Sequence, residues 1–214
     1  MKRFITYILL ILLTFFYMLV SALSYVHAVS YNLADNVFRL HLIANSNSQQ
    51  DQSLKYQVRD KIIEHVRSIG QNAHSKQELI QLINTEDLQN FTQKAVYDLG
   101  YSYPVQVEIG NFPFPSKTYG DITLPSGFYD AIRVKIGKAE GKNWWCVMFP
   151  PLCFVDVSSG IVPDDSKENL KNHLDQEEYA LISEQNSDEI KFKLKLVEMF
   201  QNFNITMSKT NSSN

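Results

Sequence analysis

The N-terminal stretch constrains the structure that the chain can adopt more than any other part of the sequence. Two cations, Lys2 and Arg3, precede an apolar run over residues 4–20, and no Asp, Glu, Lys or Arg follows until Asp35. A short basic start followed by a long apolar stretch is typical of an export signal. The run is also long enough to remain in a bilayer as a single spanning helix. The chain is therefore expected to leave the compartment in which it is made.

Two fates of this leader stay open from the sequence. Val26 and Ala28 are small residues at the minus-three and minus-one positions of a cleavage site after Ala28, which favours removal. The apolar run exceeds the usual core of a signal peptide, which favours retention. We therefore expect residues 1–28 to be a signal peptide or a membrane anchor, with membrane contact through residues 4–29 if the leader is uncleaved.

The remainder has the size and charge of one exported domain. Removing the leader leaves 186 of the 214 residues, enough for a single core. The leader holds two of the 20 basic residues and no acidic one, so 18 basic residues face 23 acidic ones and the net charge becomes −5. Phosphate binding needs a concentrated basic surface, so no nucleic-acid partner is expected. We predict a single globular α/β domain over 29–203, followed by a polar disordered tail over 204–214.

Helical periodicity dominates the first half of this domain. Ser48 can cap a helix with apolar residues every three or four positions, and Gly70 stands where that helix would end. The segment 75–78 is a capping-box pattern that starts a second helix. A third helix restarts the pattern at Thr85 and closes at Gly100.

Alternating apolar residues predict strands before and after these helices, over residues 37–44, 104–109, 128–136 and 144–149. The last two strands are expected to form a hairpin through residues 137–142. Residues 190–203 fit helical spacing better than alternation, which predicts a final helix. The predicted fold is α+β, an α/β two-layer arrangement. It has a mixed or antiparallel sheet of about four to five strands and three to four packed helices, after the N-terminal apolar segment.

Two stretches are expected to lack regular pairing or packing. Residues 111–127 are rich in prolines and aromatic residues, which predicts an ordered loop. Residues 163–186 are acidic and polar, with one weak helical stretch near Leu170 and Leu174. We interpret them as a surface excursion.

The two cysteines, Cys146 and Cys153, both lie in the exported part of the chain. A hairpin that turns at the prolines between them could bring them opposite each other, so a disulfide is possible but not required. Apolar neighbours favour inert sulfurs. The alternative is an exported cysteine hydrolase that acts on cell-wall material through Cys146 and His41. We favour His41 as a hydrogen-bonded strand histidine and predict no catalytic residue.

Metal and phosphate chemistry find little support in the sequence. The histidines are scattered, and the cysteines do not form a close Cys-x-x-Cys pair. Residues 137–142 contain two glycines and a lysine but lack the spacing and the hydroxyl residue of a phosphate-binding loop. We therefore predict no metal site and no cofactor.

One constellation exceeds the background, because aromatic, proline and polar residues gather in three short segments. Such a mixture suits a protein-binding hot spot, where rigid aromatic side chains bury area at low entropic cost. The plainer interpretation is that the tryptophans are core residues and the prolines shape turns. The predicted partner-binding residues are Tyr119, Asp121, Asn143, Trp144, Trp145, Pro150 and Pro151.

Three stretches carry a more specific pattern. They are residues 38–46 (FRLHLIANS), 117–120 (KTYG) and 142–153 (KNWWCVMFPPLC). Over about residues 37–157 the chain resembles the stage II sporulation protein R family, and the third stretch is the most specific. The residues after Ser158 carry no such pattern.

The resemblance implies a signalling protein of endospore-forming bacteria. It would be made in the forespore and exported into the space between the forespore and the mother cell. Its implied partner is a membrane-bound aspartic-type peptidase of the mother cell, which removes the pro-sequence of the mother-cell sigma factor, sigma-E, once it is activated. The family offers no catalytic residue to carry over, so the chain is expected to be an activator and not an enzyme.

Overall fold

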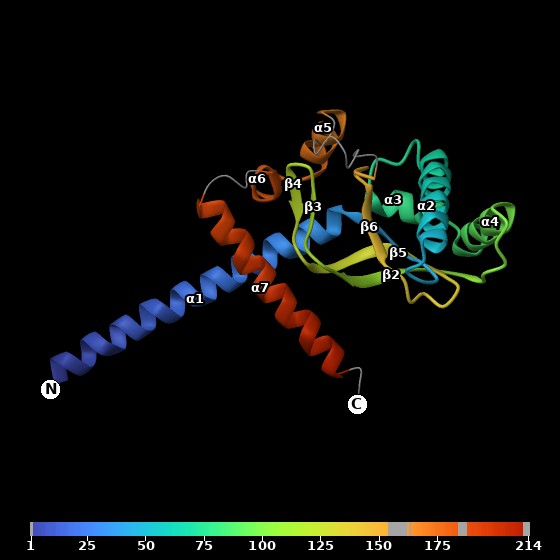
Figure 1. The fold of residues 1–214 in the computed structure, drawn as a ribbon. Helices are drawn as coiled ribbons and strands as arrows, with labels where there is room; N and C mark the ends of the chain where they lie inside the picture. Colours follow the sequence, from blue (N-terminus) through green and yellow to red (C-terminus); the bar gives the residue numbers. More distant parts are fainter. Residues whose placement is uncertain (1, 154–161, 163, 184–187, 212–214) are drawn as a thin grey trace.

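The computed structural model describes residues 2–153, 162, 164–183 and 188–211 (Figure 1). The elements in chain order are α1 (Lys2–Asn36), β1 (Phe38–Ile43), α2 (Gln49–Ile69), α3 (Lys76–Leu82), α4 (Thr85–Asp98), β2 (Val105–Phe114), β3 (Lys117–Tyr119), β4 (Ile122–Leu124), β5 (Gly127–Ile136), β6 (Asn143–Phe149), α5 (Asp164–His173), α6 (Gln176–Ser183) and α7 (Asp188–Asn211). The α+β class predicted from the sequence is confirmed.

The main sheet is mixed and has the strand order β2-β5-β1-β6. β1 pairs in parallel with β5, and the other neighbours are antiparallel. Leu40 in the middle of β1 lies opposite Ile132 of β5 on one side and Cys146 of β6 on the other. β2 and β6 therefore form the two edges of this sheet.

The predicted hairpin between the last two strands is wrong, because β1 lies between β5 and β6. The connection over 137–142 must span two strand spacings, about 10 Å, which a tight turn could not reach. It does so by passing across the end of β1. The N–H groups of Glu140 and Gly141 donate to the carbonyl oxygens of Asn45 (3.2 Å) and Ala44 (2.9 Å).

One face of the sheet is covered by α2, α3 and α4 (Figure 1). The side chains of Ser48, Ser75 and Asn84 each accept a hydrogen bond from a backbone N–H in the first turn of these helices. This confirms the predicted helix starts. The core on this face contains Leu40, Leu42, Val58, Ile62, Ile132, Val134 and Cys146.

The opposite face carries a second core beneath the β3–β4 hairpin, α5, α6 and the domain end of α1. Leu170, Leu174 and Ile182 are buried there, which corrects the interpretation of residues 163–186 as a surface excursion. The few apolar residues of these helices face the core, and their burial is not visible in the average composition of the segment, which is polar and acidic. Residues 163 and 184–186 lie outside the described residues.

The prediction of a loop over residues 111–127 is also wrong in part. β2 continues to Phe114, and β3 and β4 form a small antiparallel sheet around Gly120, whose φ is 58°. Pro113 fits into β2 because an edge strand has a neighbour on one side only, so the missing N–H can face away from the ladder.

Helix α1 is continuous from the apolar N-terminal segment to the start of the domain. Its stretch Arg3–Ala22 is the one described helix that is long and apolar enough to cross a membrane, and none of it is buried. Further along, Leu33 is buried in the second core. Lys76 donates to the carbonyl oxygen of Ala34 (3.1 Å) and pairs with Asp130 of β5 (2.8 Å), which ties the end of α1 to the sheet.

The limits of the domain stay a prediction. A cut after Ala28 and a retained anchor would both leave the buried end of α1 in place. The predicted final helix is confirmed as α7, which extends to Asn211. It therefore continues into the segment 204–214 that was expected to be a polar tail, of which residues 212–214 lie outside the described part of the chain.

Candidate functional site

A pocket of about 330 Å³ opens beside β6, at the edge of the main sheet. Residues 117–120, from β3 and its turn, form one wall, and residues 143–146 of β6 form another. The turn after β6 adds Leu152 and Cys153. Segments that are distant in the sequence thus meet here.

The two tryptophans of β6 point to opposite faces of the sheet, as successive strand residues do. Trp145 stacks on His41 with ring centroids 3.6 Å apart. Trp144 lies on the helix side, edge-on to Tyr56 (5.5 Å) and 4.4 Å from the Arg59 guanidinium. Both still line the pocket, because it lies along the strand's free edge.

The imidazole beneath Trp145 is held neutral. His41 Nε2 lies 2.9 Å from Asn143 Oδ1. Burial lowers the pKa of His41 to about 4 against the opposing effect of the Asn143 hydrogen bond, and Arg133 and Arg39 lower it further. At neutral pH the His41 ring is therefore uncharged, and it supports Trp145 in the wall of the pocket by stacking on it.

Acidification is expected to destabilise the domain through His41. The folded pKa is about 4 and the ordinary value is 6.5, so the unfolded state binds the proton first as the pH falls. This contribution to the free energy of unfolding is present above pH 6.5 and should decrease by about 2 kcal/mol between pH 7 and pH 5. Denaturant unfolding at the two pH values measures it. A His41→Gln variant that keeps the full pH dependence would contradict the assignment.

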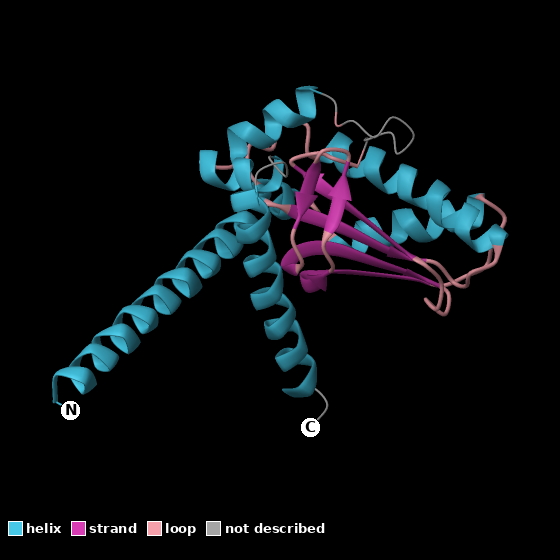
Figure 2. Cartoon of the chain, turned by 60° about the vertical axis from the view of Figure 1, so that its left-hand side comes forward, coloured by secondary structure: helices cyan, strands magenta, loops and turns pink. Residues whose placement is uncertain are grey.

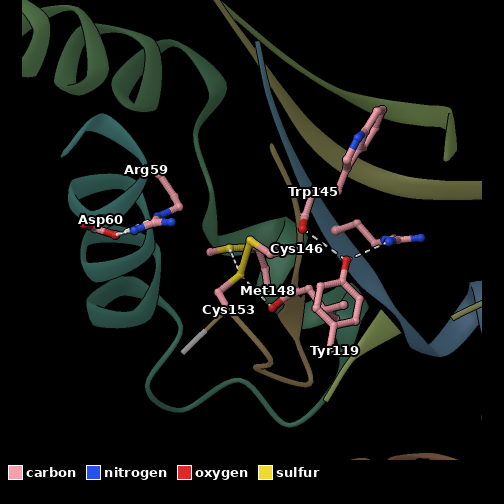
Figure 3. Close-up of a disulfide and its surroundings, with 9 residues drawn as sticks. Arg59, Asp60, Tyr119, Trp145, Cys146, Met148 and Cys153 are labelled. Atoms are coloured by element: carbon pink, nitrogen blue, oxygen red, sulfur yellow. Dashed lines mark hydrogen bonds and ion pairs between the residues drawn. A yellow bond between two sulfur atoms is a disulfide. The ribbon is translucent and has the colours of Figure 1, made fainter. Parts of the chain in front are cut away.

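A chain of hydrogen bonds fixes the wall opposite β6. Arg39 Nη2 donates to the Tyr119 hydroxyl (3.0 Å), which in turn donates to the carbonyl oxygen of Trp145 (3.2 Å) (Figure 3). The guanidinium lies over the rings of Phe114 (4.2 Å) and Tyr129 (4.8 Å). Burial raises the pKa of Tyr119 despite the Arg39 charge, so the hydroxyl stays protonated.

Arg39 itself is fully buried. Among the described residues its Nε and Nη1 have no hydrogen-bond partner. The nearby rings of Phe114 and Tyr129 supply the compensating interaction that a carboxylate would otherwise give. Tyr119 is therefore the residue through which this buried cation is connected to the pocket.

A disulfide joins Cys146 of β6 to Cys153 in the following turn, with Cα atoms 5.2 Å apart (Figure 3). The N–H of Leu152 donates to the carbonyl oxygen of Val147 (3.1 Å). The bonded Cys153 Sγ carries no proton, so its approach to that same oxygen (2.9 Å) is packing. Neither sulfur is a free thiol, and His41 lies on the other face of the sheet. The cysteine-hydrolase alternative needs a thiol beside an imidazole, and Cys146 and His41 do not provide this arrangement.

Four of the seven predicted partner-binding residues line the pocket, namely Tyr119, Asn143, Trp144 and Trp145. Asp121 lies in the turn after β3, where its carboxylate pairs with Lys167 of α5 (2.6 Å). Pro150 and Pro151 shape the turn next to the pocket without lining it.

Lys117, Thr118 and Gly120 of β3 and its turn belong to a stretch with the family pattern but were not among the predicted binding residues, and neither was the buried Arg39 behind them. A signal was present, because two short alternating stretches flank Gly120 as they would in a hairpin. The described residues contain no cluster of His, Cys, Asp and Glu that could hold a metal ion.

The family model of stage II sporulation protein R matches residues 34–159. A stage II sporulation protein R from Bacillus subtilis (strain 168) is 32% identical over 148 residues, which cover 67% of this chain. The match covers 66% of that relative, slightly less than two thirds of its length. No solved structure matches the chain. Every residue that lines the pocket falls within the family match, whereas α5, α6 and α7 follow it.

Proposed function

The chain belongs to the stage II sporulation protein R family, and we propose that it is a secreted signal that activates a membrane-bound aspartic-type peptidase. The activated peptidase then processes the pro-form of the mother-cell sigma factor, sigma-E. Family membership gives the chain a role in sporulation. The leader, the disulfide and the pocket support the finer steps of the proposal.

The export step rests on α1. Its apolar stretch Arg3–Ala22 follows the N-terminal cations, as in a signal sequence. A disulfide between Cys146 and Cys153 suits an oxidising compartment outside the cytoplasm. In this proposal the forespore makes the protein and exports it into the space between forespore and mother cell, where it acts as a ligand and not as an enzyme.

The observation that carries the activating role is the pocket beside β6. Buried groups hold its walls in place: Arg39 holds Tyr119, and His41 supports Trp145. A pocket whose shape exists before the partner arrives binds at a lower entropic cost. Rigid aromatic residues in such pockets are where protein–protein binding energy concentrates.

The lining also indicates what enters the pocket. Lys117 is the single charged residue among those that line it, and the rest are aromatic, sulfur-containing, apolar or neutral polar. This favours a large apolar or aromatic side chain of the peptidase with a carboxylate next to it, which would pair with Lys117. The proposed contact is therefore one anchoring side chain of the peptidase seated between β3 and β6.

Filling the pocket should block activation without unfolding the domain. Thr118 is exposed and lines the pocket from β3, and a strand position accepts tryptophan readily. The change gives up one hydrogen bond, between the hydroxyls of Thr118 and Thr123 (2.8 Å). Thr118→Trp should therefore be exported and folded, but should reduce processing of the sigma-factor precursor nearly to the level seen without the protein. Immunoblotting of the precursor and its product measures this, together with co-purification of the full chain with the peptidase.

The matched control is Gln106→Trp, which adds the same side chain at an exposed position on the opposite edge of the sheet. It should process and bind as the unmodified chain does. Normal processing by Thr118→Trp would show that the pocket is not the docking site. If the unmodified chain neither co-purifies with the peptidase nor supports processing in a reconstituted membrane, the activating role itself is wrong.

A further inference from the structure

Helix α7 presents an apolar stripe to its surroundings. Met199, Phe203 and Met207 are 65%, 61% and 50% exposed. Their spacing of four residues places them on one face of the helix. Three large apolar side chains in a row on an exposed helix face are typical of a surface that contacts a partner or a membrane.

The opposite side of α7 packs on the domain. Val197 is fully buried, and Gln201 lies against Gly127 at the start of β5, where an added Cβ would be 3.5 Å from the Gln201 amide carbon. At 100° per residue, these two positions lie roughly opposite Met199 and Phe203 on the helix. The apolar stripe therefore points away from the sheet.

Helix α7 also lies across α1, and the two helices are in contact (Figure 1). The crossing lies between the apolar stretch Arg3–Ala22 and the sheet. The interval from Ala22 to the buried Leu33 corresponds to about 16 Å of helix, which is little more than the diameter of one helix. A bilayer around Arg3–Ala22 would thus have its surface at the level of α7.

The second view leads to the same placement. Figure 2 shows the apolar part of α1 and the C-terminal half of α7 leaving the sheet and its covering helices on one side. A helix that crosses a membrane-spanning helix at a wide angle lies closer to the plane of the membrane than to its normal. This orientation, with one face on the domain and the apolar face away from it, is that of a helix at a membrane surface.

We propose that α7 is an interfacial membrane helix that rests Met199, Phe203 and Met207 in the bilayer surface from which α1 emerges. Residues 188–211 contain four lysines and three acidic residues. The charge is nearly balanced, so apolar burial and not attraction to anionic lipid supplies most of the binding. This inference does not depend on the identity of the peptidase.

The inference gives the protein a membrane contact that survives loss of the leader. If export ends with a cut after Ala28, α7 keeps the domain at the surface of the membrane. If α1 is retained, α7 sets the tilt of the domain. In both cases the pocket beside β6 stays close to a bilayer, where a membrane-bound partner would meet it.

Site-specific labelling of the full chain tests the proposal. The chain is reconstituted into vesicles of phosphatidylethanolamine and phosphatidylglycerol, and Phe203→Cys carries a polarity-sensitive fluorophore. Cys146 and Cys153 are bonded to each other, so the new thiol is the one that reacts. The matched control is Ser208→Cys, which is also exposed but points away from the stripe. Both positions are exposed, so neither label should disturb folding, and the helical circular dichroism should be unchanged.

The label at position 203 should emit at shorter wavelength in vesicles. It should also lose fluorescence when lipids with a nitroxide quencher near the headgroup are included, whereas the label at 208 should do neither. The proposal would be overturned if the labels at both positions responded equally. It would also be overturned if the emission of the label at 203 in vesicles stayed that of a fluorophore in water. A shift at 203 that lipid quenchers do not affect and that disappears on dilution would also overturn it, because a second copy of the chain would then cover the stripe.

Discussion

Replacing Trp145 with alanine should lower the free energy of unfolding by about 3 kcal/mol and abolish sigma-factor processing. The indole stacks on His41 at 3.6 Å and lies edge-on to Phe114 at 4.8 Å, so its loss removes part of the second core. The same change removes one wall of the pocket. Denaturant unfolding measures the first effect, and precursor cleavage measures the second.

Trp145→Phe separates packing from docking. A smaller ring keeps the stack on His41 and much of the burial, so most of the stability should return. Processing should recover only in part, because the pocket wall is shortened. A Trp145→Ala protein that is as stable as the unmodified chain would contradict the packing described here. One that is folded and fully active would exclude the pocket as the docking site.

Removing the disulfide should have the next largest effect. Cys146 and Cys153 are seven residues apart, and closing a loop of this length stabilises a domain by about 2.5 kcal/mol in the chain-entropy description. The double variant Cys146→Ser with Cys153→Ser should lose at least this amount and should process the precursor poorly, because hydrogen bonding such as that from Leu152 to Val147 then holds the turn to β6 without a covalent link. Unfolding with and without a reducing agent measures the contribution.

The double variant also provides the control for the reductant. A reducing agent should destabilise the unmodified chain by the same amount and should leave the double variant unchanged. If a reductant opens the disulfide of the unmodified chain and its stability and activity do not change, the disulfide supports neither the turn nor the pocket. Serine at the buried position 146 adds some cost of its own, so the comparison with reduced chain is the sharper one.

Features that depend on neighbouring residues were predictable from the sequence. Ser48 and Ser75 were identified as helix caps, and the structure confirms both. The class of the fold, the first strand and the final helix were also predicted correctly. Each of these depends on hydrogen bonds or apolar spacing within a few residues, which a local pattern records.

Features that depend on distant residues were not. The stretch over 137–142 reads locally as a hairpin turn, and only the placement of β1 between its two strands shows that it is a crossing connection. Trp144 and Trp145 were grouped in one patch, and both line the pocket, but their separate partners, Tyr56 for Trp144 and His41 for Trp145, come from distant segments. Arg39 was not singled out, because its partner Tyr119 is 80 residues away.

By itself, the sequence determined that this chain begins with a long apolar segment after two cations, that three helices lie between the first strand and the later strands, and that it resembles one sporulation family. The tertiary structure decided which strands are neighbours, which face each tryptophan occupies and where a pocket opens. It also placed α7 against α1 and left the apolar stripe of α7 exposed. The physical reason is the distance along the chain over which the deciding interactions act. Caps and periodic burial are set by residues within one or two helical turns, whereas a pocket and an exposed face exist only where segments far apart in the chain have packed together.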